Sequence, residues 1–293
     1  MRSIIKVIDG VGKGDKINLV LMGDFHVGNI GCDEAKIKEH VEYIRRTPNT
    51  FWVDMGDKAE FITASDKRWD SGSVAEWMEV KGINDLPYLQ AKRYVSLVKP
   101  IASKCLGLIE GNHEYTIYKH YHQNIQERIC VELGVPNLGF LCVVGLSFRQ
   151  KGRHTSNSAL VRICLTHGAG GSRYIGGKLN RLIAMGNDFE GVSVFAMGHM
   201  HDKITYKKKK MFINHDNQIS SKTISFCAVP SFFHTYNDGS TSYGERALYS
   251  PTSIGATKIT IKPFVEEYAG CTTKNGHTTP RHIKRPPDIH VSE

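Results

Sequence analysis

Five short apolar runs in this chain end next to a glycine and a side chain that can bind a metal ion. The runs read NLVLM, FWVDM, KCLGLI, VRICLT and VSVFAM, and they lead into GDFH, GD, EGNHE, HG and GHMH. Short apolar runs bounded by turn residues predict buried strands. Because strand ends of α/β proteins converge at one edge of a sheet, the pattern predicts a single polar site there.

Helical periodicity lies between these runs, and further strand-like segments follow the last of them. We expect helices over 33–46, 86–98, 114–133 and 174–185, and additional strands over 140–148, 204–213, 223–229 and 257–261. Alternating strands and helices followed by consecutive strands predict an α/β fold with two packed sheets and helices outside them. We expect one domain over 1–265, an irregular insertion over 58–86 that could form a lid, and a basic, proline-containing tail over 266–293, of which the last fifteen or so residues are loosely held.

Length and composition exclude several classes of protein. The 293 residues contain no apolar run long enough to cross a bilayer, so an integral membrane protein is not expected. The 7 cysteines are odd in number and none are spaced as CxxC, which is typical of reduced thiols and not of a disulfide framework. The N-terminus shows no signal peptide, so we expect a cytoplasmic protein.

The polar residues at the strand ends form a set with metal-ligand chemistry, and they are Asp24, His26, Asp57, Asn112, His113, His167, His199 and His201. Oxygen and imidazole donors without thiolates suit Mn²⁺, our first choice, with Fe, Zn²⁺ or Ni²⁺ as alternatives. The set is too large for one ion and suits two ions that share a carboxylate. Each piece alone has an ordinary explanation: GNHE can cap a helix, and His167 alone can be a strand-end histidine.

In this order, GDFH, GD, GNHE, THG and GHMH resemble the motifs of the calcineurin-like metallophosphoesterase superfamily over 24–201. The resemblance implies a four-layer α/β/β/α sandwich with a dinuclear metal centre and a bridging hydroxide. It implies that one metal is held by Asp24, His26 and His201, the other by Asn112, His167 and His199, and that Asp57 bridges them. His113 matches the catalytic histidine of the family, which lies beside the metals.

The segment GDKAEF departs from the family pattern in two places. Many members carry an aspartate three residues after the bridging aspartate, and that residue orients the catalytic histidine. Glu60 occupies this place here, so we expect either an orienting carboxylate or a plain solvated charge. The protein serine/threonine phosphatases carry a phosphate-binding arginine next, where this chain has Phe61, which argues against a phosphatase of that type.

Three features near the motifs could bind substrate. Arg173, in the glycine-rich segment GAGGSRYIGG, could clamp a phosphate, or the segment could be a flexible turn. His234 lies in an aromatic segment that could stack on a base or pack against the core. Lys207–Lys210 could contact nucleic acid or simply cover a solvated hairpin.

Most of the positive charge lies after the last candidate ligand. The formal net charge is +9, and from Lys203 onward 13 basic residues face 7 acidic ones, which leaves +6 there. We therefore expect a nuclease-like phosphodiesterase acting on DNA, RNA or nucleotides, similar to stand-alone bacterial and phage members, so the chain could be phage-encoded and act in a host cytoplasm. The alternatives are a phosphomonoesterase acting on protein or small phosphates, and a nucleic-acid-binding module with a vestigial site. No membrane partner is expected, and the oligomeric state stays open.

Overall fold

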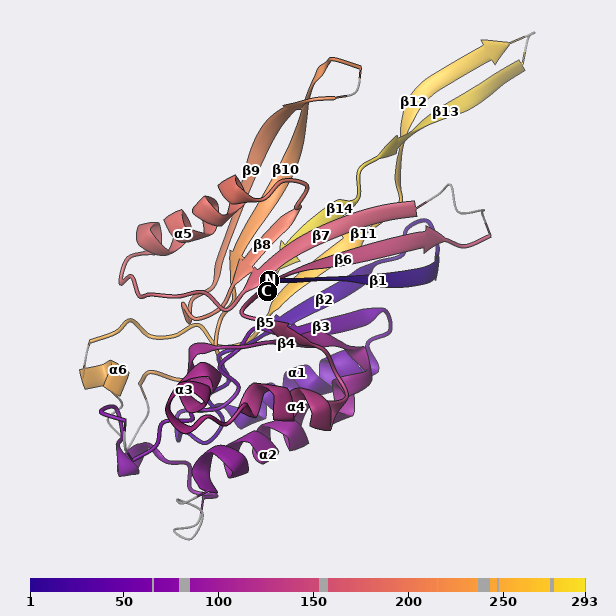
Figure 1. Ribbon diagram of the computed structural model, residues 1–293. Coiled ribbons are helices and arrows are strands. Elements are labelled where there is room, and N and C mark those ends of the chain that lie inside the picture. Colours follow the sequence, from indigo (N-terminus) through magenta and orange to yellow (C-terminus); the bar gives the residue numbers. More distant parts are fainter. Residues whose placement is uncertain are drawn as a thin grey trace.

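Two six-stranded mixed sheets pack face to face between two layers of helices (Figure 1). The computed structural model describes residues 1–64, 66–78, 85–152, 158–214, 216–236, 243–246, 248–274 and 277–292. The expected α/β/β/α arrangement is therefore confirmed. Within the described residues, no helix is both long enough and apolar enough to span a bilayer.

The first sheet carries the strands of the three N-terminal motifs. In order across the sheet, its strands are β14 (Asp288–Ser292), β11 (Thr257–Lys262), β2 (Ile17–Met22), β3 (Thr50–Asp54), β4 (Cys105–Ile109) and β5 (Asn137–Gly139). From β2 to β5 the strands are parallel, and β11 pairs antiparallel with both β2 and β14. Parallel pairing brings the carboxyl ends of β2, β3 and β4 to the same edge.

The second sheet carries the two C-terminal motifs. Its order is β1 (Arg2–Val11), β6 (Leu141–Gln150), β7 (Ser158–Thr166), β8 (Val194–Met197), β10 (Ile219–Ala228) and β9 (Ile204–Ile213). The neighbouring strands β7 and β8 are parallel, so the residues after each of them lie close together. An apolar core that includes Leu19, Val53, Val144 and Ile163 fills the space between the two sheets.

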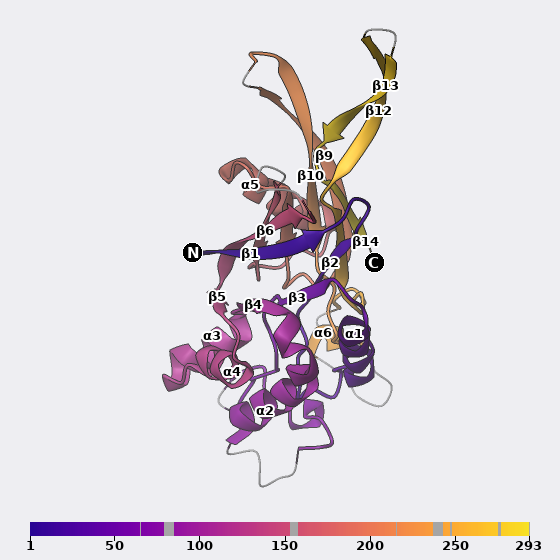
Figure 2. The same cartoon turned by 90° about the vertical axis from the view of Figure 1, so that its right-hand side faces the viewer.

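Helices cover the outer face of each sheet, as the two orthogonal views show (Figure 2). On the first sheet these are α1 (Glu34–Arg46), α2 (Leu86–Val98), α3 (Asn112–Tyr121) and α4 (Ile125–Leu133), with η1 (Ser71–Ser73) and η3 (Lys99–Lys104) in the connections. On the second sheet α5 (Ile175–Asp188) buries Leu182 against Phe195 and Phe226. A short α6 (Tyr243–Arg246) and the hairpin of β12 (Val265–Lys274) and β13 (His277–Arg285) complete the chain.

The single helix expected over 114–133 is wrong, because two helices occupy this stretch. His122 adopts a left-handed backbone conformation with φ of 55°, which ends α3. The side chain of Asn124 then accepts a hydrogen bond of 2.9 Å from the Glu127 N–H and caps α4. Asparagine is a favoured N-cap residue, so the break has a local cause.

The expectation that the last fifteen or so residues form a loosely held tail is wrong over Asp288–Ser292. These residues form β14, which pairs with β11 along its whole length and buries Val291. The preceding residues form the β12–β13 hairpin. Within the expected insertion over 58–86, Ala75 donates to the Gly28 carbonyl and Ile30 donates to the Ser73 carbonyl, which joins its described part to the loop after β2. Residues 65 and 79–84 of the insertion lie outside the description, and a lid role stays a prediction.

Candidate metal centre

The candidate ligands lie in the loops that follow four strands and in the first turn of α3. Asp24 and His26 follow β2, Asp57 follows β3, and Asn112 opens α3 just after β4. His167 follows β7, while His199 and His201 follow β8. Loops from both sheets therefore meet at one edge, as the motif positions predict.

Five of these residues have a left-handed backbone, which is uncommon for residues other than glycine. The φ angles are 50° at Asp24, 49° at His26, 52° at Asp57, 63° at His199 and 50° at His201. Such conformations persist only where the surrounding structure determines them, and they cluster at functional sites. The backbone is thus bent at the positions where the side chains must turn inward.

Two glycines allow these loops to approach closely. A Cβ atom on Gly56, where φ is 97°, would lie 2.6 Å from the His167 Nδ1. A Cβ atom on Gly111 would lie 2.1 Å from the Asp57 Oδ1. Both contacts are shorter than any real side chain tolerates, so glycine is required before Asp57 and before Asn112 for the ligands to converge.

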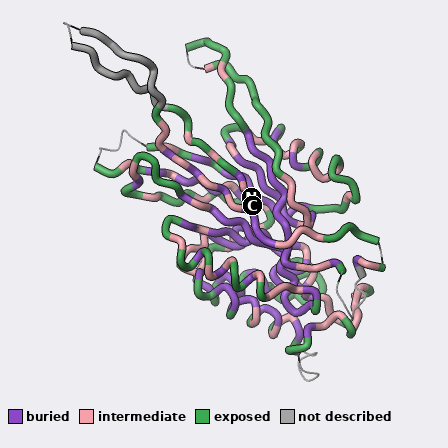
Figure 3. The backbone as a smooth tube through the Cα atoms, turned by 180° about the vertical axis from the view of Figure 1, so that it is seen from behind, coloured by how far each residue is buried: buried purple, intermediate pink, exposed green. Residues whose placement is uncertain are grey.

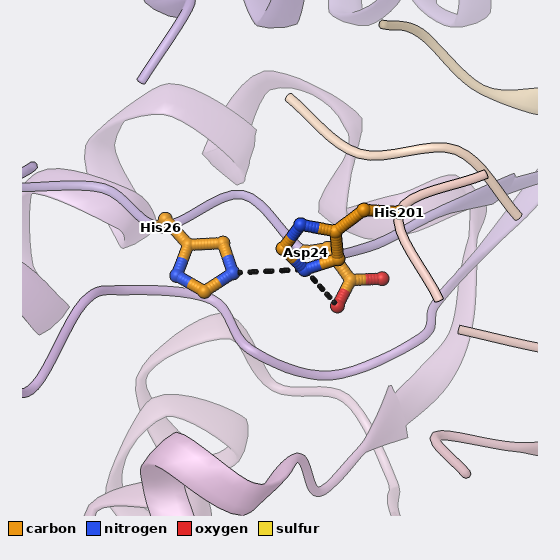
Figure 4. Close-up of side chains that lie close together, drawn as sticks. All are labelled: Asp24, His26 and His201. Atoms are coloured by element: carbon orange, nitrogen blue, oxygen red, sulfur yellow. Dashed lines mark hydrogen bonds and ion pairs between the residues drawn. The ribbon is translucent and has the colours of Figure 1, made fainter. Parts of the chain in front are cut away.

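The first candidate group consists of Asp24, His26 and His201 (Figure 4). The Nε2 atoms of His26 and His201 lie 3.3 Å apart, and the His201 Nε2 lies 3.2 Å from the Asp24 Oδ1. The other ring nitrogen of His26, Nδ1, lies 2.9 Å from a Glu60 carboxylate oxygen. An ionised carboxylate only accepts hydrogen bonds, so the proton of a neutral His26 lies on Nδ1 and its Nε2 lone pair points at His201.

The second candidate group contains His167, Asp57 and His199, with Asn112 beside them. The His167 Nε2 lies 2.9 Å from the Asn112 Oδ1 and 3.2 Å from the Asp57 Oδ2. The His167 Nδ1 lies 2.8 Å from the Met55 carbonyl oxygen and therefore carries a proton. Burial and the neighbouring His167 lower the pKa of His199 to about 4, so its imidazole is neutral and can bind a cation.

Both groups fit divalent cations, because in each of them imidazole nitrogens and carboxylate oxygens lie 3.2–3.3 Å or less from one another. Burial opposes a charged His167, but the Asp57 carboxylate outweighs burial and raises the pKa of His167 to about 10. A proton on His167 therefore balances the buried carboxylates, and a bound cation can take the place of that proton. Aspartate, asparagine and neutral histidine are the donors that Mn²⁺, Fe and Zn²⁺ accept.

His113 lies beside both groups, and its Nδ1 atom points away from them. That atom contacts the backbone carbonyl of Glu60, so it carries the ring proton of the neutral form. The His113 Nε2 lies 3.9 Å from the Asp57 Oδ2 and faces the metal centre. Burial works against a charged imidazole, but Asp57 and Glu60 outweigh it and raise the pKa of His113.

The Glu60 carboxylate does not contact His113, the histidine that it was expected to orient. The carboxylate contacts His26, and the backbone carbonyl of Glu60 contacts His113. The side chain is largely buried, with 14% exposure, so it is not a plain solvated charge either. Glu60 therefore orients two histidines through two different groups, and only its carboxylate can be changed by substitution.

We expect Glu60→Gln to raise the Mn²⁺ concentration for half-maximal activity by roughly 10–100-fold, because a partner that orients a ligand histidine typically has this effect. A metal titration of phosphodiester hydrolysis measures it. Glu132→Gln, on the exposed face of α4, is the matched control. A fall in kcat with unchanged metal dependence would instead show that the Glu60 carboxylate acts on His113.

The two residues expected to bind substrate lie outside the ligand groups. The Arg173 guanidinium lies 5.9 Å from the centroid of the Tyr249 ring. The His234 Nε2 lies 3.2 Å from the carboxylate of Asp33, which caps α1. Both roles stay predictions.

Two other residues, one by ring contact and one by its charge, act on the centre and were not assigned to it from the sequence. The ring of Phe233 lies 5.1 Å from the His26 ring and 6.1 Å from the His201 ring. Arg68 is held by Asp66 at 2.8 Å, and its charge acts on the pKa of both Glu60 and His113. An arginine that close to the centre could bind a phosphate, but its position within an irregular insertion gave no signal.

A buried ionic cluster holds the two ligand loops of the first sheet together. The Lys58 Nζ donates to the Ile109 carbonyl at 2.7 Å and lies 3.1 Å from the Asp54 Oδ1. It also lies 3.6 Å from the Glu114 Oε1. The Glu114 carboxylate in turn accepts from the N–H groups of Asp57 at 3.1 Å, Lys58 at 2.7 Å and Gly111 at 2.7 Å.

Comparisons with known proteins give distant likenesses of fold only. No family model and no curated protein matches the sequence. A predicted phosphoesterase from Streptococcus pneumoniae is 12% identical with a TM-score of 0.34, and the match covers 92% of this chain and 99% of that one. The calcineurin-like phosphoesterase YfkN from Bacillus subtilis is 10% identical with a TM-score of 0.36, and the match covers 94% of this chain and 90% of YfkN.

A putative 5′-nucleotidase from Staphylococcus aureus is also similar, at 12% identity and a TM-score of 0.37. The match covers 80% of this chain and spans only 57% of the nucleotidase. TM-scores and identities this low carry no argument about activity. The chemistry of this chain therefore rests on the side chains of its candidate metal centre.

Proposed function

We propose that this chain is a phosphoester hydrolase with two divalent metal ions, and that it acts on phosphodiesters of nucleic acids or nucleotides. The observation that carries the proposal is the convergence of buried acceptor atoms in the two groups. The Asn112 Oδ1 lies 2.9 Å from the His167 Nε2, and the Asp57 Oδ2 lies 3.2 Å from the same atom. Such a buried arrangement is unfavourable unless a cation or a proton binds it.

Two bound divalent ions would polarise the phosphoryl oxygens and lower the pKa of an attacking water. The chain itself supplies three functions around them. Asp57 is the candidate to bind both ions, since its Oδ2 lies 3.2 Å from the His167 Nε2 of the second group and its charge interacts with His26 of the first. Glu60 fixes His26, and Phe233 covers one side of His26 and His201.

His113 is the candidate general acid. The Nδ1 atom is engaged by the Glu60 carbonyl, so only Nε2 is available to a substrate. The raised pKa favours the protonated imidazole, which can donate its Nε2 proton to the departing alcohol oxygen. Arg68, close to His113, offers a guanidinium for the non-reacting phosphoryl oxygens.

Two observations favour a diester over a monoester substrate. Phe61 replaces the phosphate-binding arginine of the protein phosphatases, and it is buried with 1% exposure, so it offers nothing to a phosphate dianion. Moreover, the basic residues concentrate after the last ligand, which suits a polyanion.

We expect His113→Ala to lower kcat for bis-p-nitrophenyl phosphate by about 10²–10⁴-fold with Mn²⁺ present, the usual contribution of a general acid. The control is His120→Ala, an exposed histidine on the same helix. Wild-type activity no higher than that of His113→Ala would overturn catalysis at this centre.

A monoesterase is the competing activity. The same assay with p-nitrophenyl phosphate separates the two, because the diester proposal requires the larger kcat/KM for the bis ester. A clear preference for the monoester would replace the diesterase proposal with a phosphomonoesterase that uses Arg68 to bind the phosphate.

A further inference from the structure

The β9–β10 hairpin extends beyond the rest of its sheet as a free two-stranded ribbon (Figures 1 and 3). Its strands pair without a break from Ile219↔Ile213 to Ala228↔Ile204. Strand β10 pairs with β8 only over Ser225–Ala228, so the outer six residues of each strand have no third strand beside them. At about 3.3 Å per residue, this outer ribbon is roughly 20 Å long.

The ribbon is strongly basic. Its two strands contain five lysines and no acidic residue, and the lysines are Lys207, Lys208, Lys209, Lys210 and Lys222. All five are exposed, and within the described part of the chain none of their ammonium groups forms an ion pair. Lys210 and Lys222 stand directly opposite one another. Like charges in that position destabilise a hairpin, so the free protein gains nothing from this pair.

The positive charge covers both faces of the ribbon. Ile224 is buried in the cluster that α5 covers and lies opposite Lys208, so Lys208, Lys210 and Lys222 share that face. Lys207 and Lys209 point to the other face by alternation. A ribbon that lay flat on an anionic membrane would need lysines on one face only, whereas a ribbon inside a nucleic-acid groove has phosphates on both sides.

Four apolar side chains next to the polar turn at the tip of the ribbon are exposed to water. Met211, Phe212, Ile213 and Ile219 are 62%, 42%, 68% and 75% exposed, respectively. Exposed apolar residues grouped beyond a basic segment need a partner. In the major groove of DNA, apolar side chains contact the methyl group of thymine.

We propose that the β9–β10 hairpin is a binding arm for double-stranded DNA, which names the substrate class of the proposed phosphodiesterase and rests on that function. The major groove of B-DNA is about 12 Å wide and admits a two-stranded ribbon, whereas the major groove of A-form RNA is too narrow. The lysines contact phosphates of both strands, and the apolar end contacts bases.

The arm also sets a minimum length for its substrate. Ile204 pairs with Ala228 at the level of β8 where the loop with His199 and His201 begins, and the residues from Lys208 to Ile213 follow 4–9 residues farther along β9. This separation is roughly 13–30 Å at 3.3 Å per residue. A substrate that reaches both the arm and the metal centre therefore needs on the order of ten base pairs, at about 3.4 Å each.

The proposal is tested by fluorescence anisotropy with a 30-base-pair DNA duplex in EDTA, so that no hydrolysis occurs. We expect the variant with Lys207, Lys208, Lys209 and Lys210 changed to Gln to bind at least tenfold more weakly. The slope of log K against log salt should shrink by roughly 2–4, since each phosphate contact contributes about 0.9. The matched control changes four exposed lysines elsewhere, Lys16, Lys92, Lys99 and Lys151, and should change the affinity less than twofold.

Several outcomes overturn the arm. An equal loss of DNA affinity in the lysine variant and in its control would show that the whole basic surface attracts DNA. Tighter binding of a duplex RNA of the same length would exclude insertion into a major groove. Binding to phosphatidylserine vesicles without binding to DNA would make the hairpin a membrane contact. Self-association of the variant with unchanged DNA affinity would show that the lysines only protect an edge strand. If the variant does not fold, the slope of log K against log salt for the unmodified chain still tests the proposal, because binding without a salt dependence overturns it.

Failure of the arm is distinct from failure of the proposed function. Hydrolysis of bis-p-nitrophenyl phosphate by the unmodified chain reports on the metal centre alone, because that ester is too small to reach the arm. Intact hydrolysis with no salt-dependent DNA binding overturns only the arm.

Discussion

Asp57→Asn is expected to reduce phosphodiester hydrolysis by at least about 10³-fold, because it removes a buried carboxylate that contacts His167 of the second group and whose charge also interacts with His26 of the first. Asparagine keeps the shape of the side chain but not its charge, so both ions lose a shared ligand. A metal centre contributes several kcal/mol to charge stabilisation in the transition state, and about 4 kcal/mol corresponds to this factor. Steady-state kinetics with Mn²⁺ and the metal content of the purified protein check the two halves of the prediction.

Thermal unfolding provides an independent measure of the same change. A metal that binds only the folded chain stabilises it by RT ln(1 + [L]/Kd), so Mn²⁺ should raise the melting temperature of the unmodified chain. The rise should be much smaller for Asp57→Asn and unchanged for Asp188→Asn, an exposed control at the end of α5. An Asp57→Asn protein that retains two ions and full activity would contradict the bridging role.

The positions of the ligands could be predicted because they depend on short-range pattern. Each motif follows an apolar run, and parallel pairing of β2, β3 and β4 brings the residues after those strands to one edge. No such pattern marks the strands at two sheet edges. In β1 most side chains are exposed, and in β14 only Val291 is buried, so neither shows the apolar alternation that identifies a strand.

The role of Glu60 could not be predicted from its spacing. The motif places a carboxylate near two histidines, and the backbone conformation then decides which group each histidine meets. Phe61, the next residue, adopts φ of 48°, and its N–H donates to the Gln90 side chain, which fixes the direction of the chain at this point. The Glu60 carbonyl consequently faces His113 and its carboxylate faces His26.

Lys58 illustrates a second limit of sequence reasoning. Lysine is almost never fully buried, so a lysine after the bridging aspartate is expected to be solvated. In the structure its side chain has 0% exposure, as do the side chains of Asp54 and Glu114. Burial disfavours its ammonium, but Asp54 and Glu114 outweigh burial and raise the pKa of Lys58.

Lys58→Met should destabilise the protein by about 3–5 kcal/mol, the usual effect of removing one partner of a buried ionic cluster. Methionine fills a similar volume, so the loss reflects charge and hydrogen bonding and not a cavity. The carboxylates of Asp54 and Glu114 would remain buried without their cation. Urea unfolding of the metal-free chain gives the free energy of unfolding for each variant.

The consequence of this change extends to the metal centre, because Glu114 accepts the N–H groups of both Asp57 and Gly111. A Glu114 side chain that turns away from the interior to solvate its charge would release both ligand loops. We therefore expect Lys58→Met also to weaken Mn²⁺ binding, although Lys58 is no ligand. Tyr94→Phe, which removes only the 2.5 Å hydrogen bond to Asp54, should cost about 1 kcal/mol and leave metal binding unchanged.

A double variant separates the charge from the shape of the cluster. Lys58→Met with Asp54→Asn removes one cation and one anion together, so it should recover part of the stability lost in the single variant. Recovery of stability without recovery of metal affinity would assign the positioning of the ligand loops to the Lys58–Glu114 contact. A loss below about 1 kcal/mol for Lys58→Met would mean that water solvates the two carboxylates and that the cluster does not hold the loops.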